Sequence, residues 1–117
     1  MKDKYILTAE SVTAGHPDKL CDTIADSVLD ACLKEDPNAR VACEVLATAG
    51  KILVAGELHT TAHPDVKTIV RQTVRNAGYD CNCHVEVRLH TQSPDIAGAV
   101  DGDTLGAGDQ GIMYGYA

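Results

Sequence analysis

Two apolar runs separated by a short connection decide the fold: VACEVLA (residues 41–47), TAGK (48–51) and ILVAGEL (52–58). Runs rich in Val, Ile and Leu that flank a Gly-containing connection are typical of a β-hairpin. With an even number of residues in the connection, Ala42 faces Glu57 and Glu44 faces Ala55. We therefore expect both glutamates on one face of the sheet, as diagonal neighbours.

Helical periodicity precedes the hairpin. Gly15-His16-Pro17 is suited to open a helix, which is predicted to run to Lys34 or Glu35 and to stop before Pro37. Its predicted core face consists of Leu20, Ile24, Val28 and Ala31. Aspartates follow at i+4 steps on another side, and for the last three we expect a solvated face: Asp18, Asp22, Asp26 and Asp30.

A second amphipathic helix is predicted after Pro64 and ends near Gly78. Its apolar stripe comprises Val66, Ile69, Val70, Thr73, Val74 and Ala77. Alternation over His84–His90 predicts a half-buried strand, and Lys4–Val12 is predicted as a short first strand. These elements predict an α+β fold: a two-layer domain with a mixed or antiparallel sheet and two helices on one face.

Composition limits the classes of function. The 117 residues suit one domain, and 10 Lys and Arg against 17 Asp and Glu give a net charge of −7. No basic patch with interleaved aromatic residues is present, so nucleic acid is not expected as a partner. Five cysteines without a C-x-x-C pair indicate reduced thiols. We find no signal peptide and no apolar stretch that could span a bilayer, so we expect a cytoplasmic protein that does not bind membranes.

Two groups of side chains could carry chemistry. Glu44 and Glu57 stand alone in apolar runs, so they are costly to bury unless a cation or ammonium group meets them; the alternative is that this sheet face is wet. His16 and Asp18 lie at a helix start, where N–H groups favour phosphate and a carboxylate can carry Mg²⁺. The alternative there is an ordinary capped helix.

The stretch GAGDQG (106–111) matches G-x-G-x-x-G in spelling only, because too few residues follow for the required helix and none of them is acidic. Thr91–Gly108 shows no periodicity and is predicted to be a long functional or mobile loop. Residues 110–117 are predicted to form a strand.

These blocks carry a family resemblance. ESV (10–12), GHPDK (15–19), ARVACE (39–44), GE (56–57), QSPDI (92–96) and residues 106–117 resemble the amino-terminal domain of S-adenosylmethionine synthetase (methionine adenosyltransferase). The resemblance implies a transferase in which the methionine sulfur attacks C5′ of ATP. Tripolyphosphate leaves and is then hydrolysed to pyrophosphate and phosphate.

The resemblance also implies a role for each matching residue. The catalytic residue would be His16 at the ATP triphosphate, with Asp18 and Glu10 near Mg²⁺, Glu44 at K⁺, Glu57 at the methionine ammonium group, and Gln92 and Asp109 lining the methionine pocket. Residues 92–108 would be a mobile gating loop, and residues 110–117 the opening strand of a middle domain. The family implies a homodimer with a shared active site, assembled as a dimer of dimers.

On this interpretation residues 1–117 form a single domain that is inactive alone. One alternative is a free-standing, non-catalytic domain that binds a synthetase or a nucleotide. Another is a generic Mg²⁺-dependent nucleotide hydrolase, which would cleave ATP without methionine.

Overall fold

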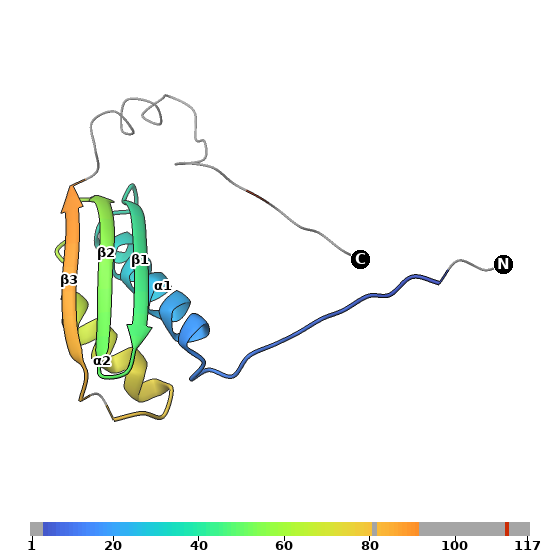
Figure 1. Cartoon of the computed structure of the whole chain (residues 1–117). Coiled ribbons are helices and arrows are strands. Elements are labelled where there is room, and N and C mark those ends of the chain that lie inside the picture. Colours follow the sequence, from blue (N-terminus) through green and yellow to red (C-terminus); the bar gives the residue numbers. More distant parts are fainter. Residues whose placement is uncertain (1–3, 81, 92–111, 113–117) are drawn as a thin grey trace.

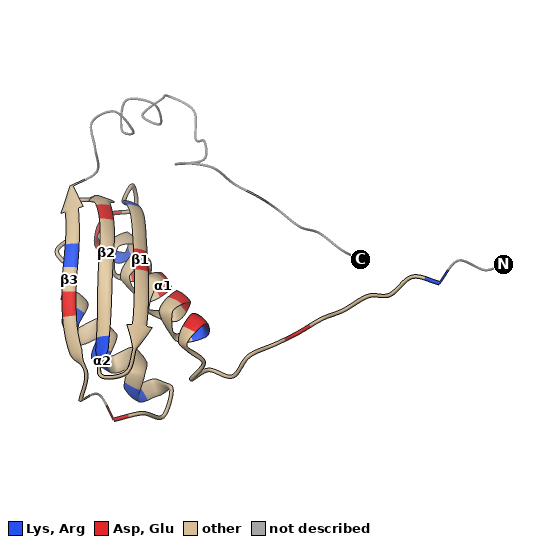
Figure 2. Cartoon of the chain, in the orientation of Figure 1, with Lys and Arg blue, Asp and Glu red and all other residues tan. Residues whose placement is uncertain are grey.

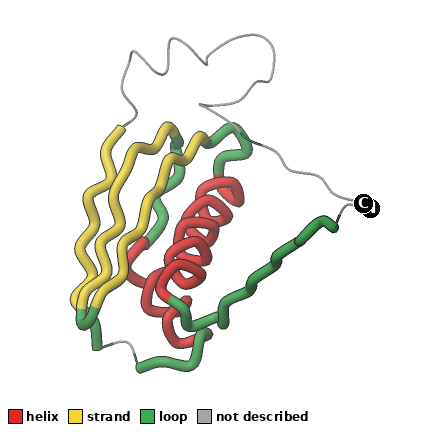
Figure 3. The backbone as a smooth tube through the Cα atoms, turned by 45° about the vertical axis from the view of Figure 1, so that its right-hand side comes forward, coloured by secondary structure: helices red, strands yellow, loops and turns green. Residues whose placement is uncertain are grey.

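The computed structural model describes residues 4–80, 82–91 and 112, and it contains two helices and three strands in that part of the chain. In chain order these are α1 (Pro17–Glu35), β1 (Arg40–Thr48), β2 (Lys51–His59), α2 (Val66–Asn76) and β3 (His84–Thr91). Figure 1 shows both helices on the same face of the sheet, and Figure 3 shows this from a second direction. The predicted two-layer α+β fold is confirmed.

The sheet is mixed, with strand order β1-β2-β3. Strands β1 and β2 pair antiparallel around a turn at Ala49-Gly50, where Gly50 has a φ of 73° in the left-handed region that glycine tolerates best. Strand β3 pairs parallel to β2, as the intervening helix α2 allows. The predicted register of the hairpin is confirmed, because Ala42 pairs with Glu57 and Glu44 pairs with Ala55.

The core lies between the helices and one face of the sheet. Alternate residues of each strand point into it, while the others lie on the opposite face, which we call the open face. The buried apolar residues are Leu20, Ile24, Val28, Cys32, Ile52, Val54, Ala62, Val66, Val70, Val74 and Val85. With no Phe or Trp in the chain, small aliphatic side chains fill this interior.

Helix α1 keeps its predicted bounds, but one predicted core residue differs. Cys32 is fully buried, whereas Ala31 is only half-buried. The buried side chains therefore continue the i+4 row from Leu20, which is a natural contact ridge of a helix against a neighbouring layer. The acidic residues Asp22, Asp26 and Asp30 are exposed, so the predicted solvated face is confirmed. Figure 2 shows acidic positions along α1 in red.

Helix α2 is fixed at both ends by local hydrogen bonds. Asp65 caps its first turn by accepting from the Thr68 N–H at 3.1 Å and the Thr68 hydroxyl at 2.8 Å. At the other end Tyr79 N–H donates to the Val74 carbonyl and Gly78 N–H to the Arg75 carbonyl. Gly78 has a φ of 91°, so this is the paired-bond helix ending that glycine favours, as predicted.

The predicted strand over Lys4–Val12 is wrong, because residues 4–13 form neither helix nor strand. Figure 1 shows this segment running away from the sheet. A strand needs the N–H and C=O groups of a partner, and no described residue pairs with this segment. Its apolar residues Tyr5, Ile6 and Leu7 are accordingly exposed. Within residues 4–80 and 82–91, no helix is long and apolar enough to cross a lipid bilayer.

Candidate functional site

His16 and Asp18 come together at the start of α1. His16 is the N-cap residue, and its Nδ1 accepts a hydrogen bond from the Asp18 N–H at 3.2 Å. The same nitrogen lies 4.0 Å from Asp18 Oδ2, and the Asp18 side chain is 90% exposed. Because Nδ1 acts as an acceptor, the neutral imidazole carries its proton on Nε2. The capped helix is therefore confirmed, and it leaves a donor and a carboxylate facing solvent.

Glu44 and Glu57 both lie on the open face, as the register requires. Glu44 is exposed and Glu57 is half-buried. The neighbours of Glu44 in sequence, Cys43 and Val45, pack against the core, so they do not enclose its carboxylate. The exposure of Glu44 fits a wet face, and it also leaves the carboxylate open to a cation.

A charged cluster on the open face was not predicted from the sequence. Glu86 Oε2 lies 2.6 Å from Lys51 Nζ, and Glu86 Oε1 lies 3.0 Å from Arg88 Nε. The hydrogen bond from Lys51, followed by that from Arg88, lowers the pKa of Glu86 to about 2. Only the parallel pairing of β2 with β3 places Lys51 opposite His84 and beside Glu86, and that register has no local sequence signal.

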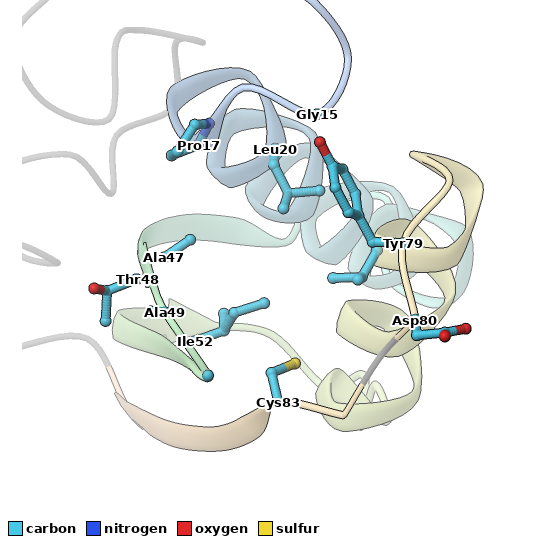
Figure 4. A pocket seen from close by; sticks show the side chains of 12 residues that line it. Gly15, Pro17, Leu20, Ala47, Thr48, Ala49, Ile52, Tyr79, Asp80 and Cys83 are labelled. Carbon is cyan, nitrogen blue, oxygen red and sulfur yellow. The ribbon is translucent and has the colours of Figure 1, made fainter.

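A cavity of about 400 Å³ opens beside the start of α1 (Figure 4). Leu20 of α1, Ile52 of β2 and Cys83 line it together with the Thr48–Gly50 turn. Tyr79 packs so closely over Gly15 that a Cβ at position 15 would collide with its ring. Gly15 therefore leaves room for the Tyr79 ring at this helix start. The sequence offers no pattern that indicates this cavity.

The described cysteines Cys21, Cys32 and Cys43 are free thiols. Burial raises the pKa of Cys21, Cys32 and Cys43, in the last case to about 11. These three thiols stay protonated at neutral pH, so they are poor nucleophiles and poor metal ligands.

The candidate residues lie at different ends of the sheet. Residues of the helix start share a cavity with the β1–β2 turn, whereas Glu57 lies six residues along β2 from Lys51, about 20 Å at the rise of a strand. Glu10 is exposed in the unpaired segment before α1. Gln92, Asp109, the predicted loop 92–108 and the predicted strand 110–117 lie outside the described residues, apart from Ile112.

No metal cluster is formed by the described side chains. Among residues 4–80, 82–91 and 112, no three or more His, Cys, Asp or Glu are arranged to hold an ion.

Comparison with known proteins shows the family to which this chain is similar. Residues 4–101 match the family model described as S-adenosylmethionine synthetase, N-terminal domain. The chain is 48% identical to a protein of Mesoplasma florum named S-adenosylmethionine synthase, over 97% of this chain and 33% of that protein. It thus spans about a third of the length of this relative. On these two matches, the chain belongs to the S-adenosylmethionine synthetase family, as its N-terminal domain.

Proposed function

We propose that this chain is the N-terminal part of an enzyme that makes S-adenosylmethionine from ATP and L-methionine. The observation that carries the proposal is the 48% identity, over 97% of the chain, with a protein named S-adenosylmethionine synthase. Because the chain spans only about a third of that relative, groups outside residues 1–117 complete the active site. Residues 1–117 alone are proposed to be inactive.

His16 is the proposed catalytic residue at the ATP triphosphate. In the reaction the methionine sulfur forms a bond to C5′ of ATP, and the bond from C5′ to the triphosphate oxygen breaks. Negative charge then builds up on the departing oxygen. A neutral imidazole whose Nδ1 is held by the Asp18 N–H can aim its Nε2 proton at that oxygen, and the helix N-terminus favours the same charge.

Mg²⁺ is the proposed cofactor at Asp18, with Glu10 as a second ligand. The exposed Asp18 carboxylate fits this role, because Mg²⁺ typically takes one or two protein carboxylates and completes its shell with phosphate oxygens and water. Bound Mg²⁺ would neutralise charge on the triphosphate. The exposed carboxylate of Glu44 is the proposed ligand of K⁺, with the remaining oxygens supplied from outside the described residues.

Glu57 is proposed to hold the methionine ammonium group, with Gln92 and Asp109 lining the same pocket. The half-buried position of Glu57 supports this role, because partial desolvation strengthens the attraction between a carboxylate and an ammonium group. We further propose a cytoplasmic homodimer with a shared active site, which pairs into a dimer of dimers. The open face, which neither helix covers, is suited to a subunit contact (Figure 3).

Two substitutions at His16 in the full-length enzyme test the role of this residue. His16→Asn keeps a good N-cap but removes the imidazole, whereas His16→Ala removes both. We expect kcat for S-adenosylmethionine formation to fall about 100-fold or more in both variants. The melting temperature should fall only in His16→Ala. Wild-type kcat in His16→Asn would mean that His16 serves only as a cap.

A further inference from the structure

The carboxylate of Asp36 joins two loops at the end of the sheet that carries Glu57. Asp36 Oδ2 accepts from the Thr60 hydroxyl at 3.0 Å and from the Thr61 N–H at 2.8 Å. Its Oδ1 accepts from the Asn38 N–H at 3.1 Å. The Thr60 oxygen in turn accepts from the N–H of the buried Ala62 at 3.0 Å. We call Asp36, Thr60 and Thr61 the Asp36 clasp.

The clasp begins one residue beyond the last rung of the β1–β2 ladder. That rung pairs Arg40 with His59, and Glu57 lies only two residues before it. On the other side, the last rung described between β2 and β3 pairs Leu58 with Thr91. Glu57 therefore lies near the end of β2, two residues before its last residue, His59. Strand ends open locally at low free-energy cost unless other contacts hold them.

Gly56 weakens β2 immediately before Glu57. Its φ is 138°, which side-chain-bearing residues rarely adopt, and a Cβ there would collide with the Ala42 carbonyl oxygen. Glycine in a strand also contributes no side-chain packing. Residues 57–59 thus form a short end segment between a glycine and a loop, and the Asp36 clasp holds the loop.

We propose that the Asp36 clasp is a positioning device for the Glu57 carboxylate, and through it for the methionine ammonium group. The inference rests on the proposed role of Glu57 in binding methionine. Asp36 is suited to the task as a carboxylate, since the Thr61 N–H and the Thr60 hydroxyl lower its pKa and keep it an acceptor at neutral pH. An asparagine could not replace it, because an amide has one acceptor oxygen where the clasp uses two.

Steady-state kinetics of the full-length enzyme test this proposal. For Asp36→Asn we expect the KM for methionine to rise on the order of tenfold while the KM for ATP stays within about twofold of wild type. Thr60→Val, which removes only the hydroxyl, should shift the methionine KM in the same direction. Thr60→Ser keeps the hydroxyl and should restore the wild-type value.

Asp65→Asn is the matched control for a purely structural effect. Asp65 also accepts from a threonine N–H and hydroxyl and also has a lowered pKa, but it caps α2. The Asp65→Asn variant should have a lower melting temperature and an unchanged KM for methionine. The proposal is overturned if Asp36→Asn and Thr60→Val keep the wild-type methionine KM while Glu57→Gln raises it. An unchanged methionine KM in Glu57→Gln itself would instead overturn the proposed role of Glu57, and the inference with it.

Discussion

The neighbours of Glu86 on the open face lower the pKa of its carboxyl group. Glu86 meets Lys51 from β2 and Arg88 from its own strand, and together they lower its pKa to about 2. A group whose pKa is depressed by folding stabilises the folded state above its unfolded-state pKa. That contribution is lost as the pH falls from about 4.5 toward 2.

We predict that NMR titration of the Glu86 side-chain carboxyl in the folded protein gives a midpoint of about 2. Lys51→Met should move this midpoint upward toward the ordinary 4.5, because Lys51 makes the largest contribution to the shift. Arg88→Met should move it by less. An ordinary midpoint in the wild type would show that the cluster does not persist in solution.

Two glycines with positive φ differ in what surrounds them. A Cβ added at Gly50 would meet open space, whereas a Cβ at Gly56 would collide with the Ala42 carbonyl oxygen. We expect Gly50→Ala to lower the free energy of unfolding by about 1 kcal/mol, from backbone strain alone. Gly56→Ala should lower it by roughly 3 kcal/mol or more, because strain and backbone displacement add. Urea unfolding of both variants measures this, and equal losses would contradict the described backbone at Gly56.

At the scale of elements, sequence patterns correctly predicted the features that depend on residues close together in the chain. The bounds of α1, the register of the β1–β2 hairpin and the glycine ending of α2 were all predictable, since caps, turn length and periodicity lie within a few residues. The prediction of a strand over Lys4–Val12 was wrong, because strand formation depends on a pairing partner, and a local pattern does not show whether one is present. The Lys51–Glu86 contact and the Asp36 clasp join residues 35 and 24 or more positions apart, beyond any such pattern.

Helix α1 is predicted to contribute to stability through its buried i+4 row. Ile24 is fully buried, so Ile24→Ala should lower the free energy of unfolding by about 2–5 kcal/mol through lost burial and a cavity. Leu33 lies on the same helix but is 38% exposed, and Leu33→Ala should cost about 1 kcal/mol or less. Thermal or urea denaturation compares the two. Similar losses would mean that α1 does not pack as described.

At the scale of the whole molecule, the described residues supply some parts of the proposed active site but do not complete it. His16 and Asp18 lie near the β1–β2 turn, while Glu57 lies toward the opposite end of β2. The chain spans about a third of the length of its relative, so the proposed site needs further residues and, we propose, a second subunit. Sequence motifs predicted the identities of the candidate residues, but their separation along the sheet follows only from the assembled topology.

The central claim is tested most directly by the balance of ATP and product. The full-length protein, with ATP, Mg²⁺ and K⁺, is assayed with and without L-methionine, and S-adenosylmethionine and ATP are quantified by mass spectrometry. We predict one S-adenosylmethionine for each ATP consumed, no ATP loss without methionine, and no product from residues 1–117 alone. ATP loss without methionine, or no S-adenosylmethionine when methionine is present, would contradict the proposed function.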